Sequence, residues 1–342
     1  MISAWGAPKL CVMRCETSRL PVCLKLALSM AVAGCGAASN AKPQAPPTTA
    51  PVVGDAPAGL AATSTDSTWL ETEKKALRLD GVASVEELKA QLTNERLSGV
   101  THLSLSGLML GADLGRFLAE TALTARLLAL DVSDNDLGSE GATALASAQH
   151  LEQLQELDLG GNEVGDAGVQ ALAEASHLEL KSLNLSGNGI GPSGVEALTG
   201  ARHLAGLTSL DLSMNPIQTS GAEALARAPY QDLKLLFLLG CDVGEKGAQA
   251  LANAGTLRRL SVLALSGNAV GDAGASAIAH SPHLTSLTLL DLSANGITSV
   301  GALELAQSPN LQSLESIELY GNDLGARGET ALRDRFDGKL GL

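Results

Sequence analysis

Apolar residues recur along most of this chain in a short pattern. Two leucines flank one residue, and an asparagine follows three positions after the second leucine. Alternate residues of a β-strand point to the same side, so each pattern predicts a short strand whose leucines face the core. The pattern returns every 26 or 27 residues, and its asparagine slot is filled by Asn135, Asn162, Asn188, Asn215, Cys241, Asn268, Asn295 and Asn322.

Each unit continues from its strand into a glycine-containing turn and a short alanine- and leucine-rich segment. After Asn162, Val164 returns to the core, and the turn 165–168 precedes a segment over 169–175 that predicts a short helix. A glycine recurs at the position of Gly168 in every full unit. This recurrence indicates either a positive φ or a neighbouring coil that lies too close for a side chain.

One such unit cannot bury its apolar face alone, so the repeats predict a stacked solenoid. The string LDLGGNEVGDAGVQALA, which begins at Leu157, resembles the ribonuclease-inhibitor-like class of leucine-rich repeats, and the resemblance covers roughly residues 77–336. It implies an α/β leucine-rich-repeat solenoid, a horseshoe with a concave parallel β-sheet and short outer helices. It also implies that the slot asparagines are buried and satisfy backbone groups of the turns.

The units at the two ends depart from the pattern, as the caps of a solenoid do. Leucine fills the asparagine slot at Leu108, and Ser84 and Glu87 have the spacing of a capping box before a helix over 85–92. The predicted parts of this region are an N-terminal capping region with degenerate repeats (68–108), leucine-rich repeats (109–336) and a C-terminal tail (337–342).

The first residues of the chain have a different composition. Four basic residues precede an apolar run over 26–33, which is too short to cross a bilayer as a helix of about 20 residues. A basic segment followed by such a run is typical of a secretory signal peptide. The run ends in Val32-Ala33-Gly34-Cys35, which resembles a bacterial lipobox. Residues 1–34 are therefore predicted to be removed and Cys35 to be lipidated; the alternative is an ordinary secretory signal before a chance cysteine.

A lipobox implies a protein that is anchored to a membrane without spanning it, since two or more acyl chains hold stably. Gly36, in place of the aspartate that favours inner-membrane retention in enteric bacteria, favours the outer membrane of the bacterial cell envelope. Residues 35–67 are rich in alanine, proline and threonine, and they predict a disordered tether behind the lipidated cysteine.

The charge of the chain restricts its partners. The formal charge is −14, and without residues 1–34 it becomes −17, from 19 Lys plus Arg against 36 Asp plus Glu. Such acidity argues against binding to nucleic acid or to an anionic lipid surface, and it suits a basic protein. Cys241 would be the single free thiol of the processed chain, so we expect no disulfide.

No set of residues indicates catalysis, a cofactor or a metal. The glycine pairs are repeat turns and lack the lysine of a phosphate-binding loop. His150, His203 and His283 share one repeat position, twelve residues before the asparagine slot, without a cysteine or histidine cluster beside them. We interpret them as rim residues and not as ligands.

The residue between the two strand leucines is predicted to face the concave side. Acidic residues there form a row that we expect to steer a partner: Asp131, Asp158, Asp211, Asp291 and Glu318. The row is interrupted by an apolar group that we expect to be exposed as a binding patch: Leu235, Phe237, Leu239, Val262 and Leu289. Two alternatives remain, a merely solvated charge row and a strand in a shifted register that buries Phe237.

These patterns predict a monomeric, non-enzymatic protein of the cell envelope that binds a partner protein on its concave face. Two other functions stay open. Solenoids of the resembled class include activators of small GTPases, which would make the protein a GTPase-activator-like regulator. The chain would otherwise be a structural spacer of the envelope.

Overall fold

The computed structural model describes residues 76–342. The predicted signal peptide, the lipidation of Cys35, the tether and the first residues of the capping region lie outside the described residues. Within 76–342, no helix is both long and apolar enough to cross a bilayer.

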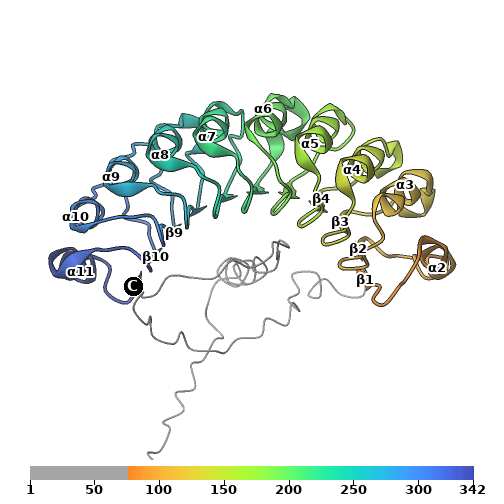
Figure 1. Ribbon diagram of the computed structural model, residues 1–342, viewed down its shortest axis with the longest axis horizontal. Coiled ribbons are helices and arrows are strands. Elements are labelled where there is room, and N and C mark those ends of the chain that lie inside the picture. The colour runs from red at the N-terminus through yellow and green to blue at the C-terminus, as the bar shows by residue number, and fades with distance from the viewer. Residues whose placement is uncertain (1–75) are drawn as a thin grey trace, which may run out of the picture. The chain divides into compact units, whose positions relative to one another are not determined.

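Residues 76–342 form a solenoid in which strands and helices alternate (Figure 1). All strands belong to one parallel sheet and lie side by side in sequence order. The strands are β1 (Ala76–Arg78), β2 (His102–Ser104), β3 (Ala129–Asp131), β4 (Glu156–Asp158), β5 (Ser182–Asn184), β6 (Ser209–Asp211), β7 (Leu235–Phe237), β8 (Val262–Ala264), β9 (Leu289–Asp291), β10 (Ser316–Glu318) and β11 (Leu340–Gly341).

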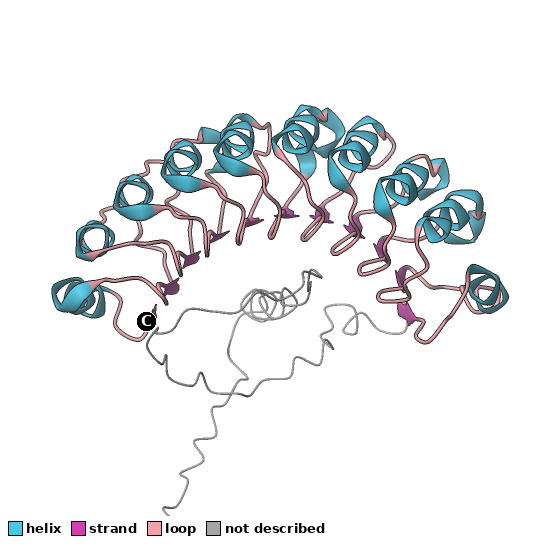
Figure 2. Ribbon diagram, in the orientation of Figure 1, coloured by secondary structure: helices cyan, strands magenta, loops and turns pink. Residues whose placement is uncertain are grey.

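The helices form an outer layer around the sheet, so the strands line the inner side of an open arc (Figure 2). They are α2 (Val85–Gln91), α3 (Ala112–Glu120), α4 (Gly138–Ala146), α5 (Gly165–Glu174), α6 (Pro192–Gly200), α7 (Gln218–Arg227), α8 (Gly244–Ala252), α9 (Gly271–Ala279), α10 (Ser299–Ala306) and α11 (Gly325–Arg335). The predicted α/β leucine-rich-repeat solenoid is confirmed.

The core lies between the sheet and the helices. In the unit of Asn162, Leu157 and Leu159 of the strand region are 2% and 0% exposed, and Leu172 of α5 is 2% exposed. The helix begins at Gly165, four residues earlier than predicted, because Gly165 adopts a φ of 60° and turns the chain directly into it.

Close packing between coils explains the recurrent second glycine. Gly168 has no positive φ, but a Cβ there would lie 2.5 Å from Val164 Cγ1 and 3.1 Å from Ala142 Cβ. The same glycine position is tight in other units, as at Gly194, Gly247 and Gly274. The glycine is therefore required by lack of space and not by a positive φ, and the space at Gly168 is filled by Val164 of the same coil as well as by Ala142 of the preceding coil.

The slot asparagines form the buried ladder that the resemblance implies. Asn162 Oδ1 accepts hydrogen bonds from the backbone N–H groups of Asn135 (3.0 Å) and Leu137 (3.2 Å) in the preceding coil. Its Nδ2 donates to the carbonyl of Val132 (2.9 Å) in that coil and to the carbonyl of Leu159 (3.0 Å) in its own. Each asparagine thus joins two coils.

Both ends of the solenoid continue the sheet. At the N-terminal end, β1 pairs in register with β2, and Ser84 Oγ accepts a hydrogen bond from Glu87 N (3.2 Å) at the start of α2, as the capping-box spacing predicts. At the C-terminal end, residues 337–342 were expected to be a tail. They instead include β11, which pairs with β10 and covers its edge.

Candidate functional site

The outward residues of the strands form one row across the concave face. The register pairs each of them with its equivalent on the next strand, as Asp131 pairs with Asp158 and Asp211 with Phe237. Neighbouring strands lie about 4.8 Å apart, so the side chains of this row are close neighbours. We call it the central row: Arg78, Ser104, Asp131, Asp158, Asn184, Asp211, Phe237, Ala264, Asp291 and Glu318.

The aspartates of the central row also stabilise the turns that follow the strands along the chain. One carboxylate oxygen, Oδ1, accepts the N–H of the residue two positions later, at 3.0 Å for Asp131, 2.9 Å for Asp158 and 2.8 Å for Asp211. Asn184 makes the same bond to Ser186 N at 2.9 Å. An amide therefore serves the turn as well as a carboxylate does, and the turn does not require the negative charge.

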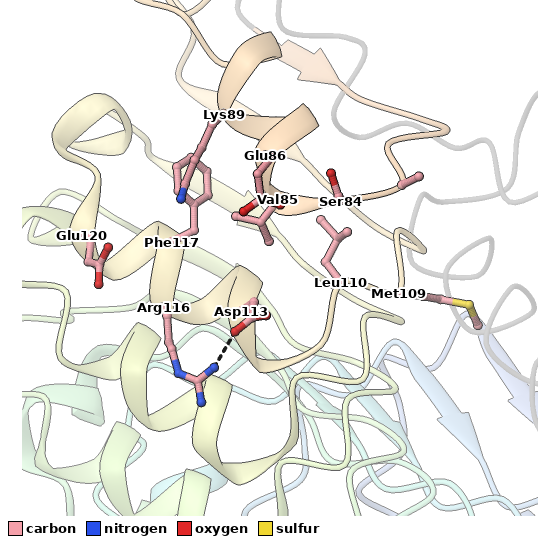
Figure 3. Close-up of a pocket in the computed structure, with 11 residues that line it drawn as sticks. Ser84, Val85, Glu86, Lys89, Met109, Leu110, Asp113, Arg116, Phe117 and Glu120 are labelled. Atoms are coloured by element: carbon pink, nitrogen blue, oxygen red, sulfur yellow. Dashed lines mark hydrogen bonds and ion pairs between the residues drawn. The ribbon is translucent and has the colours of Figure 1, made fainter.

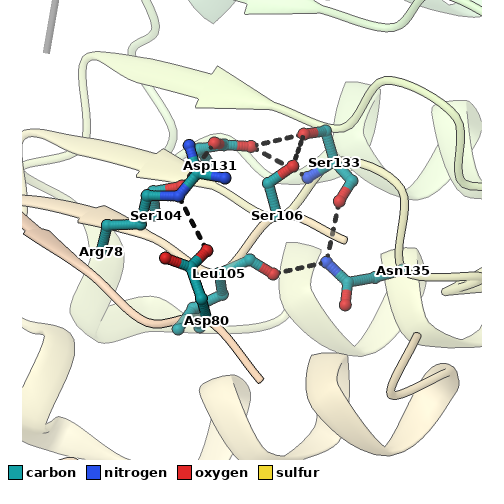
Figure 4. A network of polar contacts seen from close by, with 8 residues as sticks. All are labelled: Arg78, Asp80, Ser104, Leu105, Ser106, Asp131, Ser133 and Asn135. Atoms are coloured by element: carbon teal, nitrogen blue, oxygen red, sulfur yellow. Dashed lines mark hydrogen bonds and ion pairs between the residues drawn. The ribbon is translucent and has the colours of Figure 1, made fainter. Parts of the chain in front are cut away.

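At the first acidic position, both carboxylate oxygens are used inside the protein (Figure 4). Ser104 Oγ donates to Asp131 Oδ2 (2.7 Å), while Ser133 Oγ donates to Asp131 Oδ1 (2.7 Å). Arg78 begins the row on β1, and its Nε donates to Asp80 Oδ1 (2.9 Å). Arg78 was not included in the predicted row, although it lies between Leu77 and Leu79 as the other row residues lie between two strand residues that face the core.

Asp211 differs from the other acidic residues of the row. Its side chain is only 4% exposed, whereas Asp131, Asp158, Asp291 and Glu318 are partly exposed. Asp211 Oδ1 accepts from Ser213 N, but Oδ2 is buried and has no hydrogen-bond partner. Burial raises the pKa of Asp211 to about 6, against the opposing effect of hydrogen bonds from the side chain and the backbone N–H of Ser213.

Asp158 also has a perturbed carboxyl group. Burial, followed by repulsion from Asp131, raises the pKa of Asp158 to about 7. Asp211 adds a smaller repulsion from two strands away. Asp158 and Asp211 therefore ionise less readily than a solvated aspartate, and a neighbouring cation would favour their ionised forms.

The apolar interruption is not the exposed patch that was expected. Phe237, Val262 and Leu289 are 6%, 3% and 5% exposed, and Leu235 and Leu239 are partly buried. A shifted register is not the reason, because Leu236 pairs with Leu210 and Leu263 as a regular strand requires. Phe237 stands at an outward position in register with Asp211 and Ala264, and it is nevertheless nearly buried.

Several exposed apolar side chains lie elsewhere, and sequence reasoning did not single them out. Met214 and Tyr320 follow β6 and β10 and are 53% and 54% exposed. Met109 is 74% exposed at the mouth of a cavity of about 450 Å³ between α2 and α3 (Figure 3). In that cavity, Lys89 Nζ lies 5.6 Å from the centre of the Phe117 ring, and Arg116 pairs with Asp113.

The three histidines that share a repeat position lie in separate coils and are partly exposed. His150 and His203 are near His177, which interacts with both, while His283 lies several coils away. Burial lowers the pKa of His150 and of His203, and His177 lowers both further. Within residues 76–342, no group of three or more His, Cys, Asp or Glu side chains is arranged to hold a metal ion.

Comparison with known proteins supports the repeat architecture. The family model described as Leucine Rich repeat matches residues 127–146, 150–173, 179–198, 206–226, 257–279 and 283–306. No curated protein matches the chain.

Three solved structures illustrate the proteins to which this structure is similar. A protein from Bacteroides fragilis is 16% identical, with 75% of each chain covered and a TM-score of 0.48. Internalin C2 from Listeria monocytogenes is 25% identical, with 66% of this chain and 84% of that chain covered and a TM-score of 0.48. A TLR13–ssRNA13 complex is 22% identical over 78% of this chain, with a TM-score of 0.48, and this chain spans only 35% of the TLR13 chain.

Each of the six matched segments is a copy of the strand, asparagine slot and helix described above, and the unit of β7 and α8, which carries Cys241 in the slot, lies between the fourth and the fifth. This chain is a leucine-rich-repeat protein.

Proposed function

We propose that this protein is a monomeric, non-enzymatic binding module that holds a partner protein on its concave face and is anchored to the bacterial cell envelope through Cys35. The observation that carries the proposal is the central row. Strands β1 to β10 place the side chains of the central row, in register, on the side of the sheet that faces away from the helices. Such a long, regular surface of outward side chains suits recognition of another macromolecule.

Charge narrows the class of partner. The chain carries a formal charge of −14, and the central row contributes Asp131, Asp158, Asp211, Asp291 and Glu318. Complementary charge steers association and excludes wrong partners, so a basic protein fits this face better than an acidic one.

The binding proposal is tested with two matched arginine substitutions. Ser209→Arg places a bulky side chain at an outward position of β6, and Gln170→Arg places the same side chain on the exposed surface of α5. Full-length protein would be solubilised from membranes of the native host and used to capture partners, which mass spectrometry would identify. We expect Ser209→Arg to weaken capture of the partner at least 10-fold and Gln170→Arg to leave it unchanged, at unaltered melting temperatures.

Equal capture by both variants would contradict binding on the concave face. If no saturable partner is captured by the unsubstituted protein, the spacer function takes its place.

The anchoring proposal rests on the lipobox resemblance and has its own test. The substitution Cys35→Ser removes the sulfur that would carry the lipid. In bacteria fed a radiolabelled fatty acid, we expect the unsubstituted protein to be labelled and to sediment with outer membranes, while Cys35→Ser is unlabelled and soluble. A Cys35→Ser protein that still sediments with membranes would contradict lipid anchoring.

A further inference from the structure

The carboxylate of Asp211 has an unused hydrogen-bonding oxygen on the concave side of the sheet. Leu210 and Leu212 flank it along the chain and are fully buried in the core, so Asp211 points to the opposite side. Oδ1 accepts from Ser213 N at 2.8 Å, while Oδ2 has no partner. Buried polar groups normally have a partner, so an unpaired carboxylate oxygen calls for an explanation.

The fold itself does not account for this charge. The equivalent residue on β5, Asn184, closes its turn with a 2.9 Å bond and carries no charge. The equivalent residue on β8 is Ala264, which has no polar side chain, and β8 still pairs in register with β7 and β9. A solvated charge row does not account for it either, because Asp211 is 4% exposed.

The surroundings of Asp211 define what would satisfy it. On one side lie Asn184 and, two strands away, the partly exposed Asp158; on the other side lies the ring of Phe237. Lysine and arginine combine an apolar stem with a charged hydrogen-bond donor, so their stem suits the ring and their head suits the carboxylates. A metal ion is a poorer match, since no group of three or more potential ligands gathers within residues 76–342.

We propose that Asp211 is the binding site for a lysine or arginine side chain of the partner protein, whose stem packs on Phe237. This inference rests on the proposed function and adds the chemistry of the contact. Because Asp211 and Phe237 are 4% and 6% exposed, binding at this site requires side chains of the concave face to move aside. Asp131 is not part of the site, because Ser104 and Ser133 already occupy both of its oxygens.

The test uses a random nonapeptide phage library selected on the full-length protein. The variant Asp211→Asn keeps an acceptor for Ser213 N, as Asn184 does for Ser186 N, and removes the charge. Asp291→Asn is the matched control, since Asp291 holds the same slot on β9 and makes the same turn bond to Ser293 N at 2.9 Å. Melting temperatures would confirm that both variants are folded.

We expect selected peptides to share a lysine or arginine at one position next to apolar residues. A synthetic peptide of this sequence should bind at least 10-fold more weakly when norleucine replaces the basic residue. The affinities of Asp211→Asn for the basic peptide and for its norleucine version should agree within 2-fold. Asp291→Asn should prefer the basic peptide as strongly as the unsubstituted protein does.

Enriched peptides without a basic residue, or equal losses in the two variants, would overturn the inference and leave concave-face binding intact. Failure to enrich any peptide would also count against the inference. The proposed function fails separately, when Ser209→Arg has no effect on partner capture.

Discussion

At the scale of single residues, the asparagine slot shows how much one side chain contributes to a solenoid. Asn162 is fully buried and bonds to backbone groups of two coils through both ends of its amide. Cys241, in the same slot, offers one weak donor, and its Sγ lies 3.1 Å from the carbonyl oxygen of Leu212. Two residues in equivalent places therefore have very different roles.

This difference predicts unequal costs of truncation. Asn162→Ala leaves several buried N–H and C=O groups unpaired, so we expect it to lower the free energy of unfolding by at least about 3 kcal/mol. Cys241→Ala removes one weak hydrogen bond and one sulfur atom, and should cost roughly 1 kcal/mol. Urea denaturation at 25 °C measures both. Equal losses would show that the slot stabilises through packing alone.

Asp211 is a second residue whose effect on stability can be predicted, and here the effect depends on pH. Its folded pKa, about 6, exceeds the ordinary value of 3.8, so the folded state retains its proton more strongly than the unfolded state does. Above pH 6 Asp211 is ionised in both states, and its burial as a charged group lowers the free energy of unfolding by the full amount. This loss of stability disappears as the pH falls to 3.8.

Asp211→Asn should consequently stabilise the protein, by on the order of 2 kcal/mol at pH 8, with a gain that shrinks toward zero at pH 4. Thermal unfolding across this range tests the prediction, with Asp291→Asn as the control that should show a smaller gain. A gain that is constant with pH would argue against a raised pKa in Asp211.

At the scale of elements, the distance between neighbouring helices is set by glycine. Gly115 of α3 faces Gly141 of α4, and a Cβ on Gly115 would lie 2.2 Å from the Gly141 carbonyl oxygen. The two backbones thus approach too closely for any side chain. By contrast, a Cβ on Gly200, the last residue of α6, would meet nothing within 4 Å.

Two alanine substitutions test this packing. Gly115→Ala pushes α3 from α4 and should lower the free energy of unfolding by about 1–3 kcal/mol. Gly200→Ala adds no clash and reduces the freedom of the unfolded chain, so a gain of about 0.5–1 kcal/mol is expected. Chemical denaturation distinguishes them; a neutral Gly115→Ala would mean that the helices can separate at little cost.

At the scale of the whole solenoid, stability depends on its ends, because each coil contacts only its neighbours. The edge of β10 is covered by β11, through hydrogen bonds from Ile317 N to Lys339 O and from Leu319 N to Gly341 O, both 2.8 Å. An open parallel edge would present unpaired backbone groups to other molecules.

Deletion of residues 338–342 should therefore lower the melting temperature by about 2–4 °C and promote self-association. Lys339→Ala is the control: it keeps β11 and removes only the bond from Nζ to Leu314 O. Calorimetry and light scattering over a range of concentrations measure the two effects. A truncated chain that melts normally and stays monodisperse would show that β11 is dispensable.

Much of the candidate site could be placed from the sequence. The position of Asp131, Asp158 and Asp211 in one row follows from their shared place between strand leucines, and the register confirms it. His177 was missed because the histidines were aligned by their distance to the following asparagine, and the spacing from Asn162 to Asn188 is one residue shorter than in most units. Measured from the preceding asparagine, His177 occupies the same position as His150. The strand β11 was missed because the last unit lacks the full pattern.

The sequence by itself determined the architecture, since the period, the asparagine slot and the alternating leucines are local features that each coil repeats. Only the tertiary structure decided which outward side chains are accessible. Phe237 and Asp211 are nearly buried although both occupy outward positions, whereas Asp158 remains partly exposed. The exposure of an outward side chain depends on side chains in the neighbouring coils, which are 26 or 27 residues away in the sequence. Its hydrogen bonds to those coils depend on distances between coils, which the sequence of one unit does not determine.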